Sequence, residues 1–194
     1  SEVLVPVIND PGGVMPIIFL GLIPVPVDIE KNSYNTNLEE VKKRITKKTS
    51  AVIVCHIGGE PADIIPIKKY LKKNKIKLIE DCSQSHGASI NKQKVGTFGD
   101  IAFFSTKSSK LHSTGGQGGV VYSNKKKLIE KSKMFADRGK LIINNKFMGK
   151  YESVGLNCNI DEISAAIGNV QIRKLPNIIK RTNHIGNYIS KKLL

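Results

Sequence analysis

Short apolar runs alternate with amphipathic segments along most of this chain of 194 residues. This alternation predicts parallel strands joined by helices that cover the faces of one sheet. Strand-like runs occupy residues 2–6, 23–29, 50–56, 76–82, 100–105 and 118–123. Helix-like segments occupy residues 13–20, 38–45, 63–73, 125–138 and 160–175, and a further helix is expected from Pro176 onward. The chain is therefore predicted to adopt an α/β fold with a mostly parallel central sheet flanked by helices.

Polar residues stand at the expected starts of three of these helices. Asn37, Asp63 and Asn124 can each accept a hydrogen bond from a free N–H group in the first turn that follows. The chain contains no internal repeat. It opens mid-pattern at Ser1 and closes inside a helical pattern, so both ends are expected to be cuts through a larger protein.

The charge of the chain is strongly positive, at +15 with an isoelectric point near 9.7. Most of it comes from lysines that lie in pairs along the helix-like segments, and aromatic residues make up only 6% of the chain. Proteins that bind single-stranded nucleic acids stack the bases on aromatic side chains, which are scarce here. The charge therefore indicates a solvated, lysine-rich surface, and specific nucleic-acid binding is not expected.

Cysteine usage and hydropathy indicate a cytoplasmic protein. Cys55, Cys82 and Cys158 lie far apart without a CxxC pair, and the four histidines lack the spacing of metal ligands. Neither a disulfide framework nor a metal site is expected. The longest apolar tract, residues 12–27, contains prolines and glycines, is too short to span a bilayer and follows no charged leader. We expect a chain that does not enter a membrane.

Three apolar strands end on polar side chains, namely His56, Asp81 and Ser105. In open α/β sheets, ligands bind outside the carboxyl ends of the strands, so these side chains are expected to face one crevice. Asp81 is the most informative, because a carboxylate at the end of a buried strand needs a partner. Two partners stay open, the N–H groups of the next segment or a protonated ring nitrogen of a cofactor. Gln84 and His86 follow closely enough to line the same wall.

Residues 102–123 place two lysines among hydroxyl groups, between an apolar run and a glycine run. A nucleotide-binding P-loop has its glycines before the lysine, so this order excludes a P-loop. A lysine at the mouth of an apolar crevice can lose its proton and condense with a carbonyl group. A carboxylate, a hydroxyl and such a lysine are what pyridoxal phosphate requires, because they supply a partner for the pyridinium, an anchor for the phosphate and an amine for imine formation.

Six segments carry a family resemblance, and in chain order they read VIVCHIGGEPADI, LIEDCSQSHGA, VGTFGDIAFFS, GGQGGVVYS, DRGK and GLNCNIDEISAAIGNVQIRKL. They resemble the successive motifs of the DegT/DnrJ family of pyridoxal-phosphate-dependent sugar aminotransferases. The resemblance implies fold type I, with residues 1–165 as part of the large cofactor-binding domain. Residues 166–194 would then be helices that lead toward a small C-terminal domain absent from this chain.

The resemblance implies roles for four residues in the middle of the chain. Asp81 matches the aspartate that binds the pyridine nitrogen, and Gln84 matches the glutamine that contacts the ring hydroxyl. Ser105 matches the serine on the cofactor phosphate. Lys110 matches the lysine that forms an imine with the cofactor, which makes Lys110 and Asp81 the expected catalytic residues. Lys107 is the rival, and the spacing from Ser105 to the glycine run favours Lys110.

Asn157 and Asn159 fall in a short family motif whose amide reaches the cofactor phosphate of the neighbouring subunit. The resemblance thus implies a homodimer with shared active sites. Two positions depart from the family pattern, because Gln117 stands where an acid is common and Cys158 where an aromatic is usual. The aromatic side chain that stacks on the cofactor is not evident near Asp10 either.

The activity implied by the resemblance is transfer of an amino group from an amino acid, with L-glutamate favoured, to a keto-sugar carried on a nucleotide. Such reactions belong to polysaccharide or aminosugar biosynthesis. Two other readings stay open. One is a sugar dehydratase on the same scaffold, whose members use histidine in place of the lysine; His112 lies near, but Lys110 is present and His112 is expected to make an ordinary loop hydrogen bond. The other is a truncated, non-catalytic family member.

Overall fold

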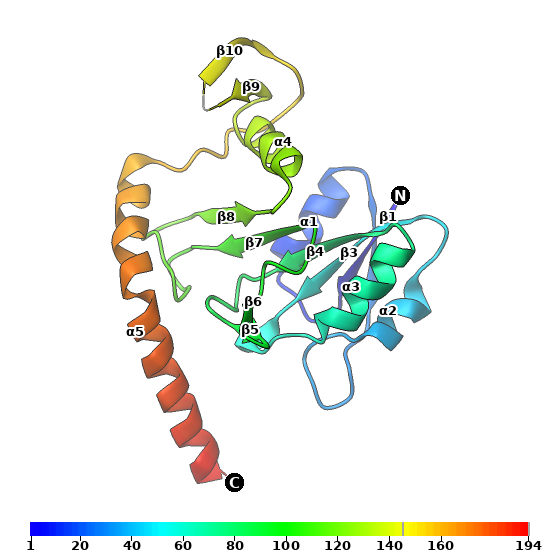
Figure 1. The fold of residues 1–194 in the computed structure, drawn as a ribbon, viewed down its shortest axis with the longest axis vertical. Coiled ribbons are helices and arrows are strands. Elements are labelled where there is room, and N and C mark those ends of the chain that lie inside the picture. Colours follow the sequence, from blue (N-terminus) through cyan, green and yellow to red (C-terminus); the bar gives the residue numbers. More distant parts are fainter. Residues whose placement is uncertain (145, 194) are drawn as a thin grey trace. The chain divides into compact units, whose positions relative to one another are not determined.

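A computed structural model describes residues 1–144 and 146–193 of the chain. Its central feature is a six-stranded sheet with the strand order β2-β1-β3-β4-β7-β8 (Figure 1). The strands are β1 (Glu2–Pro6), β2 (Ile23–Val27), β3 (Thr49–Cys55), β4 (Lys77–Asp81), β7 (Ile101–Ser105) and β8 (Gly119–Tyr122). The pairings from β2 through to β7 are parallel. The predicted strands and the mostly parallel sheet are therefore confirmed.

Five α-helices are present in the described residues, namely α1 (Pro11–Phe19), α2 (Leu38–Arg44), α3 (Ile64–Lys73), α4 (Lys126–Ala136) and α5 (Glu162–Leu193), with a short 3-10 helix η1 (Ile57–Gly59). Two antiparallel hairpins pair β5 (Ser89–Ile90) with β6 (Gln93–Lys94) and β9 (Lys140–Ile143) with β10 (Lys146–Tyr151). Neither hairpin was predicted, because the strands of the first are two residues long and β10 is exposed at every position. None of the described helices combines the length and the apolar character needed to cross a membrane.

Two apolar layers hold the sheet, one on each face. Neighbouring residues of a strand point to opposite faces, so Val54 of β3 joins one layer and Ile53 joins the other. The first layer is completed by α2 and α3, for example through Ile67, and the second by α1 through Ile17. Burial of one such side chain contributes about 1.5–3 kcal/mol. These layers fix the strand ends from which the site residues emerge.

The chain divides into two compact units. The first contains residues 1–104 and 121–159, with most of the sheet, helices α1 to α4 and both hairpins. The second contains residues 105–120 and the chain from Ile160 onward, which forms α5. The sequence-based division into residues 1–165 and 166–194 stays a prediction.

The prediction of a separate helix from Pro176 onward is wrong. Pro176 lies inside α5, which is continuous from Glu162 to Leu193. A proline inside a helix removes its own N–H donor and crowds the carbonyl of residue i−4, but the residues on both sides of Pro176 remain helical. The start of α5 is secured by Asp161, whose carboxylate accepts a hydrogen bond from the Ser164 N–H at 2.8 Å.

The predicted helix caps had mixed outcomes. Asn37 caps α2, since its Oδ1 accepts a hydrogen bond from the Glu40 N–H at 3.0 Å. Asp63 occupies the N-cap position of α3, but among the described residues its side chain makes no capping hydrogen bond. The Asn124 cap is wrong, because Asn124 Oδ1 accepts a hydrogen bond from the Tyr122 hydroxyl instead.

Candidate functional site

Asp81 ends β4, where its register partners are Cys55 of β3 and Phe103 of β7, and it is only 8% exposed. Its Oδ1 accepts a hydrogen bond from the Ser83 N–H at 2.9 Å, and its Oδ2 lies 3.7 Å from Cys55 Sγ. Burial raises the pKa of the Cys55 thiol, and the negative charge of Asp81 raises it further, so the thiol keeps its proton and donates to the carboxylate. A carboxylate offers about four acceptor positions. Asp81 therefore keeps acceptor capacity beyond these two donors.

The neighbouring carboxylate, Glu80, lies on the opposite face of β4, and 0% of its side chain is exposed. Oε1 accepts hydrogen bonds from the N–H groups of Phe98 at 2.7 Å and Gly99 at 2.5 Å, and Oε2 accepts one from Gly96 at 2.7 Å. Burial raises the pKa of Glu80, but the hydrogen bonds from His56 and the loop N–H groups outweigh burial and leave this pKa below its usual value. Glu80 thus holds the loop before β7 as a carboxylate.

The expectation that His56 shares a crevice with Asp81 is wrong. The His56 side chain turns to the face of Glu80, where 0% of it is exposed and Nε2 lies 3.3 Å from Glu80 Oε2. Its Nδ1 accepts a hydrogen bond from the Ala62 N–H at 3.0 Å. Nε2 is therefore the protonated nitrogen and donates to Glu80. Both ring nitrogens are engaged, so His56 is a structural link behind the sheet edge.

The ligand atoms of His56, Glu80 and Cys82 lie within 4.8 Å of one another, close enough to suggest a metal centre. Their chemistry does not fit one. Both His56 nitrogens and both Glu80 oxygens already take part in hydrogen bonds. Burial raises the pKa of the Cys82 thiol, and the charge of Glu80 raises it further, so the sulfur stays protonated. The three residues form a buried hydrogen-bonded cluster.

Gln84 lies on the loop that follows β4, and its side chain is exposed. Its Oε1 accepts a hydrogen bond from the Gly58 N–H of η1 at 2.8 Å. Because the oxygen is occupied, the Nε2 group is the end of the amide that is left to donate. His86, two residues further on, is buried and packs against Phe104, with 5.6 Å between the ring centroids.

The loop that carries Lys110 belongs to the second unit, and its base is closed by two threonines. The Thr106 N–H donates to the Gly118 carbonyl at 2.9 Å, and the Thr114 N–H donates to the Thr106 carbonyl at 2.8 Å. The two threonine hydroxyls are buried and lie 3.1 Å apart. A Cβ atom on Gly118 would come within 2.5 Å of Thr106 Oγ1, so this position favours glycine. Backbone and hydroxyl contacts thus fix the ends of the loop.

Lys110 and Lys107 differ in their exposure to solvent within this loop. Lys110 is half-buried, whereas Lys107 is exposed. The Lys110 N–H donates to the Lys107 carbonyl at 3.0 Å, which forms a turn that separates the two side chains by three residues. Ser105 ends β7 just before this turn, and its Oγ lies 3.5 Å from the Lys107 nitrogen. Of the two lysines, Lys110 is therefore the less exposed to solvent.

His112 makes the ordinary hydrogen bond that the sequence predicted for it. Its Nε2 lies 3.1 Å from the carbonyl oxygen of Gly168 in α5, so this nitrogen donates. Gly168 is buried, and a Cβ atom there would come within 3.0 Å of Thr114 Cγ2. His112 therefore fastens the loop to α5.

Asn157 and Asn159 lie on the exposed segment after β10, at the end of α4. The Nδ2 of Asn159 donates to Asn157 Oδ1 at 3.1 Å. Asp137, which follows α4, forms a backbone bridge with Asn157. Hydrogen bonds from Arg138 and Lys140, with a smaller contribution from Asn159, lower the pKa of Asp137 to about 2. The structure therefore brings the two predicted asparagines together.

The predicted site residues are divided between the two units. The first unit holds Asp81, Gln84, Asn157 and Asn159, and the second holds Ser105 and Lys110. The role of Glu80 was missed. The dipeptide Glu80–Asp81 carried a usable signal, because two adjacent carboxylates on a buried strand must face opposite sides and find separate partners.

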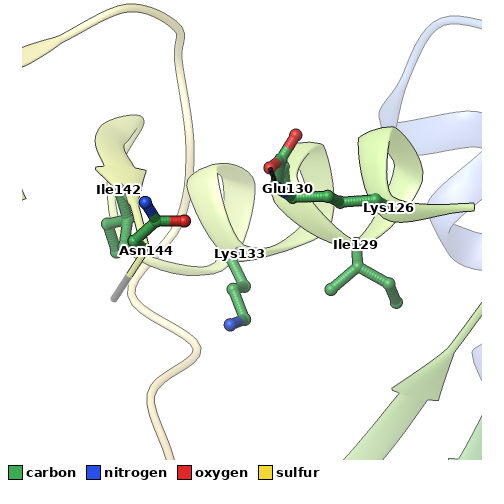
Figure 2. A pocket seen from close by; sticks show the side chains of 6 residues that line it. All are labelled: Lys126, Ile129, Glu130, Lys133, Ile142 and Asn144. Atoms are coloured by element: carbon green, nitrogen blue, oxygen red, sulfur yellow. Dashed lines mark ion pairs between the residues drawn. The ribbon is translucent and has the colours of Figure 1, made fainter. Parts of the chain in front are cut away.

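A pocket of about 330 Å³ lies beside α4 and β9, apart from the predicted residues (Figure 2). It is lined by Lys126, Ile129, Glu130, Lys133, Ile142 and Asn144. Lys126 and Glu130 form an ion pair across one helical turn, at 3.7 Å. None of the residues assigned to the candidate site lines this pocket.

The family described as the DegT/DnrJ/EryC1/StrS aminotransferase family matches residues 1–194. The chain belongs to this family. Membership confirms the resemblance, and the observed sheet with its helices confirms the predicted α/β fold class.

Individual relatives show how much of a family member the chain represents. The GDP-perosamine synthase of Vibrio cholerae is 34% identical over 193 residues, which are 100% of this chain and 52% of the relative. A dTDP-3-amino-3,6-dideoxy-alpha-D-galactopyranose transaminase of Aneurinibacillus thermoaerophilus is 33% identical over 190 residues, 97% of this chain and 50% of the relative. The chain spans about half the length of the curated relatives it matches.

Among solved structures, the GDP-4-keto-6-deoxy-D-mannose-3-dehydratase of E. coli, with bound hydrated PLP, is similar in fold. The TM-score is 0.90 at 26% identity, over 99% of this chain and 53% of that chain. The fold of this chain is thus similar to that of a dehydratase, and its sequence is similar to that of a transaminase.

Proposed function

We propose that the full-length protein is a pyridoxal-phosphate-dependent aminotransferase. It would move an amino group from an amino acid, with L-glutamate favoured, to a keto-sugar carried on a nucleotide. Family membership supports the reaction class. The observation that carries the proposal is the carboxylate of Asp81, buried at the end of β4 with acceptor positions to spare.

The residues present fit the cofactor. A protonated pyridine nitrogen needs a buried anion that accepts its hydrogen bond. Asp81 is such an anion, and none of the ion pairs among the described residues involves it. The amide of Gln84 fits the ring hydroxyl, since its Nε2 is left to donate. Ser105 would bind the phosphate.

Proton transfer would fall to Lys110. When bound, pyridoxal phosphate supplies an electron sink that stabilises negative charge at the Cα atom of the amino acid. The Nζ of Lys110 would take the Cα proton as a general base and return it as a general acid in the second half of the cycle. Asp81 would keep its hydrogen bond to the ring nitrogen throughout. The threonine-closed base of the Lys110 loop limits the freedom of the amine.

The substrates and assembly are also proposals. The two curated relatives are named for sugars carried on GDP and on dTDP, which supports a nucleotide-linked sugar as the acceptor class. Asn157 and Asn159 would reach the cofactor phosphate of a second copy, so the protein would be a homodimer with shared active sites. We propose a cytoplasmic location, residues 1–165 as part of the large domain, and residues 166–194 as the approach to a smaller one.

A second candidate function is dehydration of a nucleotide-linked sugar, which the likeness to the E. coli dehydratase favours. Two features argue against it. Lys110 is present, and the Nε2 of His112 is engaged with the Gly168 carbonyl oxygen, which leaves it less free to abstract a sugar proton.

The test uses the full-length protein, L-glutamate and nucleotide-linked keto-sugars. We expect glutamate to be consumed only when the sugar is aminated, and Lys110→Ala to lower the rate by at least about 10³-fold, since general acid–base catalysis alone is worth 10²–10⁴. Lys107→Ala is the matched control and should retain the rate. Loss of a sugar hydroxyl without incorporation of nitrogen into the sugar would identify a dehydratase, and absence of cofactor binding would identify a non-catalytic protein. Either result would overturn the proposal.

A further inference from the structure

Asn35 is a buried amide on the segment between β2 and α2, and only 4% of it is exposed. Its Oδ1 accepts a hydrogen bond from the Ile57 N–H at 2.8 Å, and its Nδ2 donates to the Glu60 carbonyl at 3.0 Å. Its backbone is anchored as well, because its N–H donates to Ser33 Oγ at 3.1 Å and its carbonyl accepts from the Glu30 N–H at 2.8 Å. The side chain therefore joins two segments that are distant in the sequence.

The segment that Asn35 binds is the turn η1. Ile57 and Glu60 are the two ends of this turn, and the Glu60 N–H donates to the Ile57 carbonyl at 3.1 Å. Between them, Gly58 and Gly59 have φ angles of +63° and +86°. Glycine loses more conformational entropy on folding than other residues do, and two consecutive glycines in the left-handed region are therefore costly to fix. The turn depends on contacts outside itself. Asn35 supplies a contact at each end.

The middle of η1 holds a predicted cofactor-binding residue. The Gly58 N–H donates to Gln84 Oε1 at 2.8 Å. A Cβ atom on Gly59 would lie 3.3 Å from the Gln84 carbonyl oxygen, so the turn also lies against the Gln84 backbone. Gln84 is exposed, and an exposed glutamine without such a partner would sample several rotamers.

We propose that Asn35 is a positioning residue for Gln84, acting through η1. Asn35 fixes both ends of the turn, the turn aims the Gly58 N–H at Gln84 Oε1, and this bond directs Gln84 Nε2 toward the cofactor. The inference rests on the proposed cofactor role of Gln84. It assigns a function to a residue that lies 49 positions before Gln84. Among the described residues, the hydrogen bonds of Asn35 go to Glu30, Ser33, Ile57 and Glu60, none of which is a predicted site residue.

The experiment is a double-mutant cycle on the full-length protein with Asn35→Ala, Gln84→Ala and the double variant, and pyridoxal phosphate is the titrated ligand. We expect each single variant to raise the dissociation constant by about three- to tenfold, the value of one net hydrogen bond. In the Gln84→Ala background, Asn35→Ala should add less than about twofold, because the positioned group is already gone. A purely structural role would give independent effects that multiply.

A second readout does not need the cofactor. Hydrogen exchange at the Gly58 amide of the ligand-free protein should become about tenfold faster in Asn35→Ala and in Gln84→Ala. Thr36→Val is the matched control. Thr36 is 1% exposed, and its hydroxyl has no hydrogen-bond partner among the described residues, so this variant should leave both readouts unchanged.

Asn35→Asp covers the case in which Asn35→Ala does not fold. It keeps the oxygen that accepts from Ile57, loses the donor to Glu60 and sets a second oxygen against the Glu60 carbonyl, so we expect a change in the same direction. Multiplying effects in the cycle, or an unchanged Gly58 exchange rate in the Asn35 variants, would overturn the inference. If the wild-type protein fails to bind pyridoxal phosphate, the proposed function fails, and the exchange rates still decide whether Asn35 positions Gln84.

Discussion

The two faces of β4 carry adjacent carboxylates with opposite uses. Glu80 has a fully enclosed side chain that three backbone N–H groups and His56 contact. Asp81 is nearly as buried, yet within the described part of the first unit one N–H group and one thiol donate to it. Burial alone therefore does not distinguish a structural acid from a functional one. The number of donors already in place does.

The donors also explain what each carboxylate holds together. Those of Glu80 come from the loop of residues 96–99 and from the end of β3, so Glu80 fastens the chain that enters β7. Those of Asp81 come from its own loop and from the neighbouring strand. Loss of Glu80 should therefore damage the fold, and loss of Asp81 should damage ligand binding.

The largest expected effect is on the stability of Glu80→Ala. This variant leaves two buried N–H groups, the part-buried Gly99 N–H and the buried His56 ring without an acceptor, so the free energy of unfolding should fall by about 3–5 kcal/mol. Urea denaturation of the full-length protein measures it. Glu39→Ala is the control, because 69% of the Glu39 side chain is exposed, and its effect should stay within about 0.5 kcal/mol. Equal effects of the two variants would remove the distinction between the faces of β4.

The next effect is on cofactor binding by Asp81→Ala. The free energy of unfolding should change by less than about 1 kcal/mol, since one N–H and one weak thiol donor lose their acceptor. The dissociation constant of pyridoxal phosphate should rise by about 100-fold, because a buried charged partner is worth at least about 2–5 kcal/mol. Fluorescence or absorbance titration measures it. A large loss of stability with unchanged cofactor affinity would reverse the roles given to the two acids.

The pH dependence of stability tests Glu80 more finely. Its pKa is below the ordinary value of 4.5, so its stabilising contribution is complete above 4.5 and is lost as the pH falls through the lowered value. Between about pH 6 and about pH 3, wild type should lose of the order of 1 kcal/mol more than Glu80→Gln, which has no such titration. Unfolding midpoints at several pH values measure this. Parallel curves for the two proteins would contradict the assignment.

The smallest effect is expected for Cys55→Val, which removes the weak thiol donor to Asp81 and keeps a similar volume. The cofactor dissociation constant should change by less than about threefold, and stability by less than about 1.5 kcal/mol. The same titration and denaturation measure both. A change as large as that of Asp81→Ala would mean that the thiol, and not the carboxylate, organises the site.

Much of this fold could be predicted because its strands are apolar runs, such as residues 50–56. These runs alternate along the sequence with amphipathic segments, which form the helices. The helix boundary predicted at Pro176 was wrong because the sequence shows the missing N–H donor but does not show that the residues on both sides remain helical. The exposed strand β10 has no periodic apolar signal to detect. The placement of His56 beside Asp81 was wrong because the end of a strand does not reveal toward which face of the sheet the next side chain points. In the folded chain it turns to Glu80.

For the site, the sequence could place Asp81 and Lys110 at strand and loop ends, since motif spacing and the apolar runs define those ends. It could not reveal how many donors each acid has, because the loop of residues 96–99 and the turn η1 approach β4 only in the folded chain. The role of Asn35 was hidden for the same reason, as its partners lie 22 and 25 residues away.

The most direct test of the central claim is borohydride reduction of the full-length protein with bound pyridoxal phosphate, followed by peptide mapping of the modified lysine. We expect the cofactor to be fixed to Lys110, Lys107 to stay unmodified, and labelling to be strongly reduced in Asp81→Ala. Labelling of Lys107 or of scattered surface lysines, or labelling of Lys110 that is indifferent to Asp81, would contradict it.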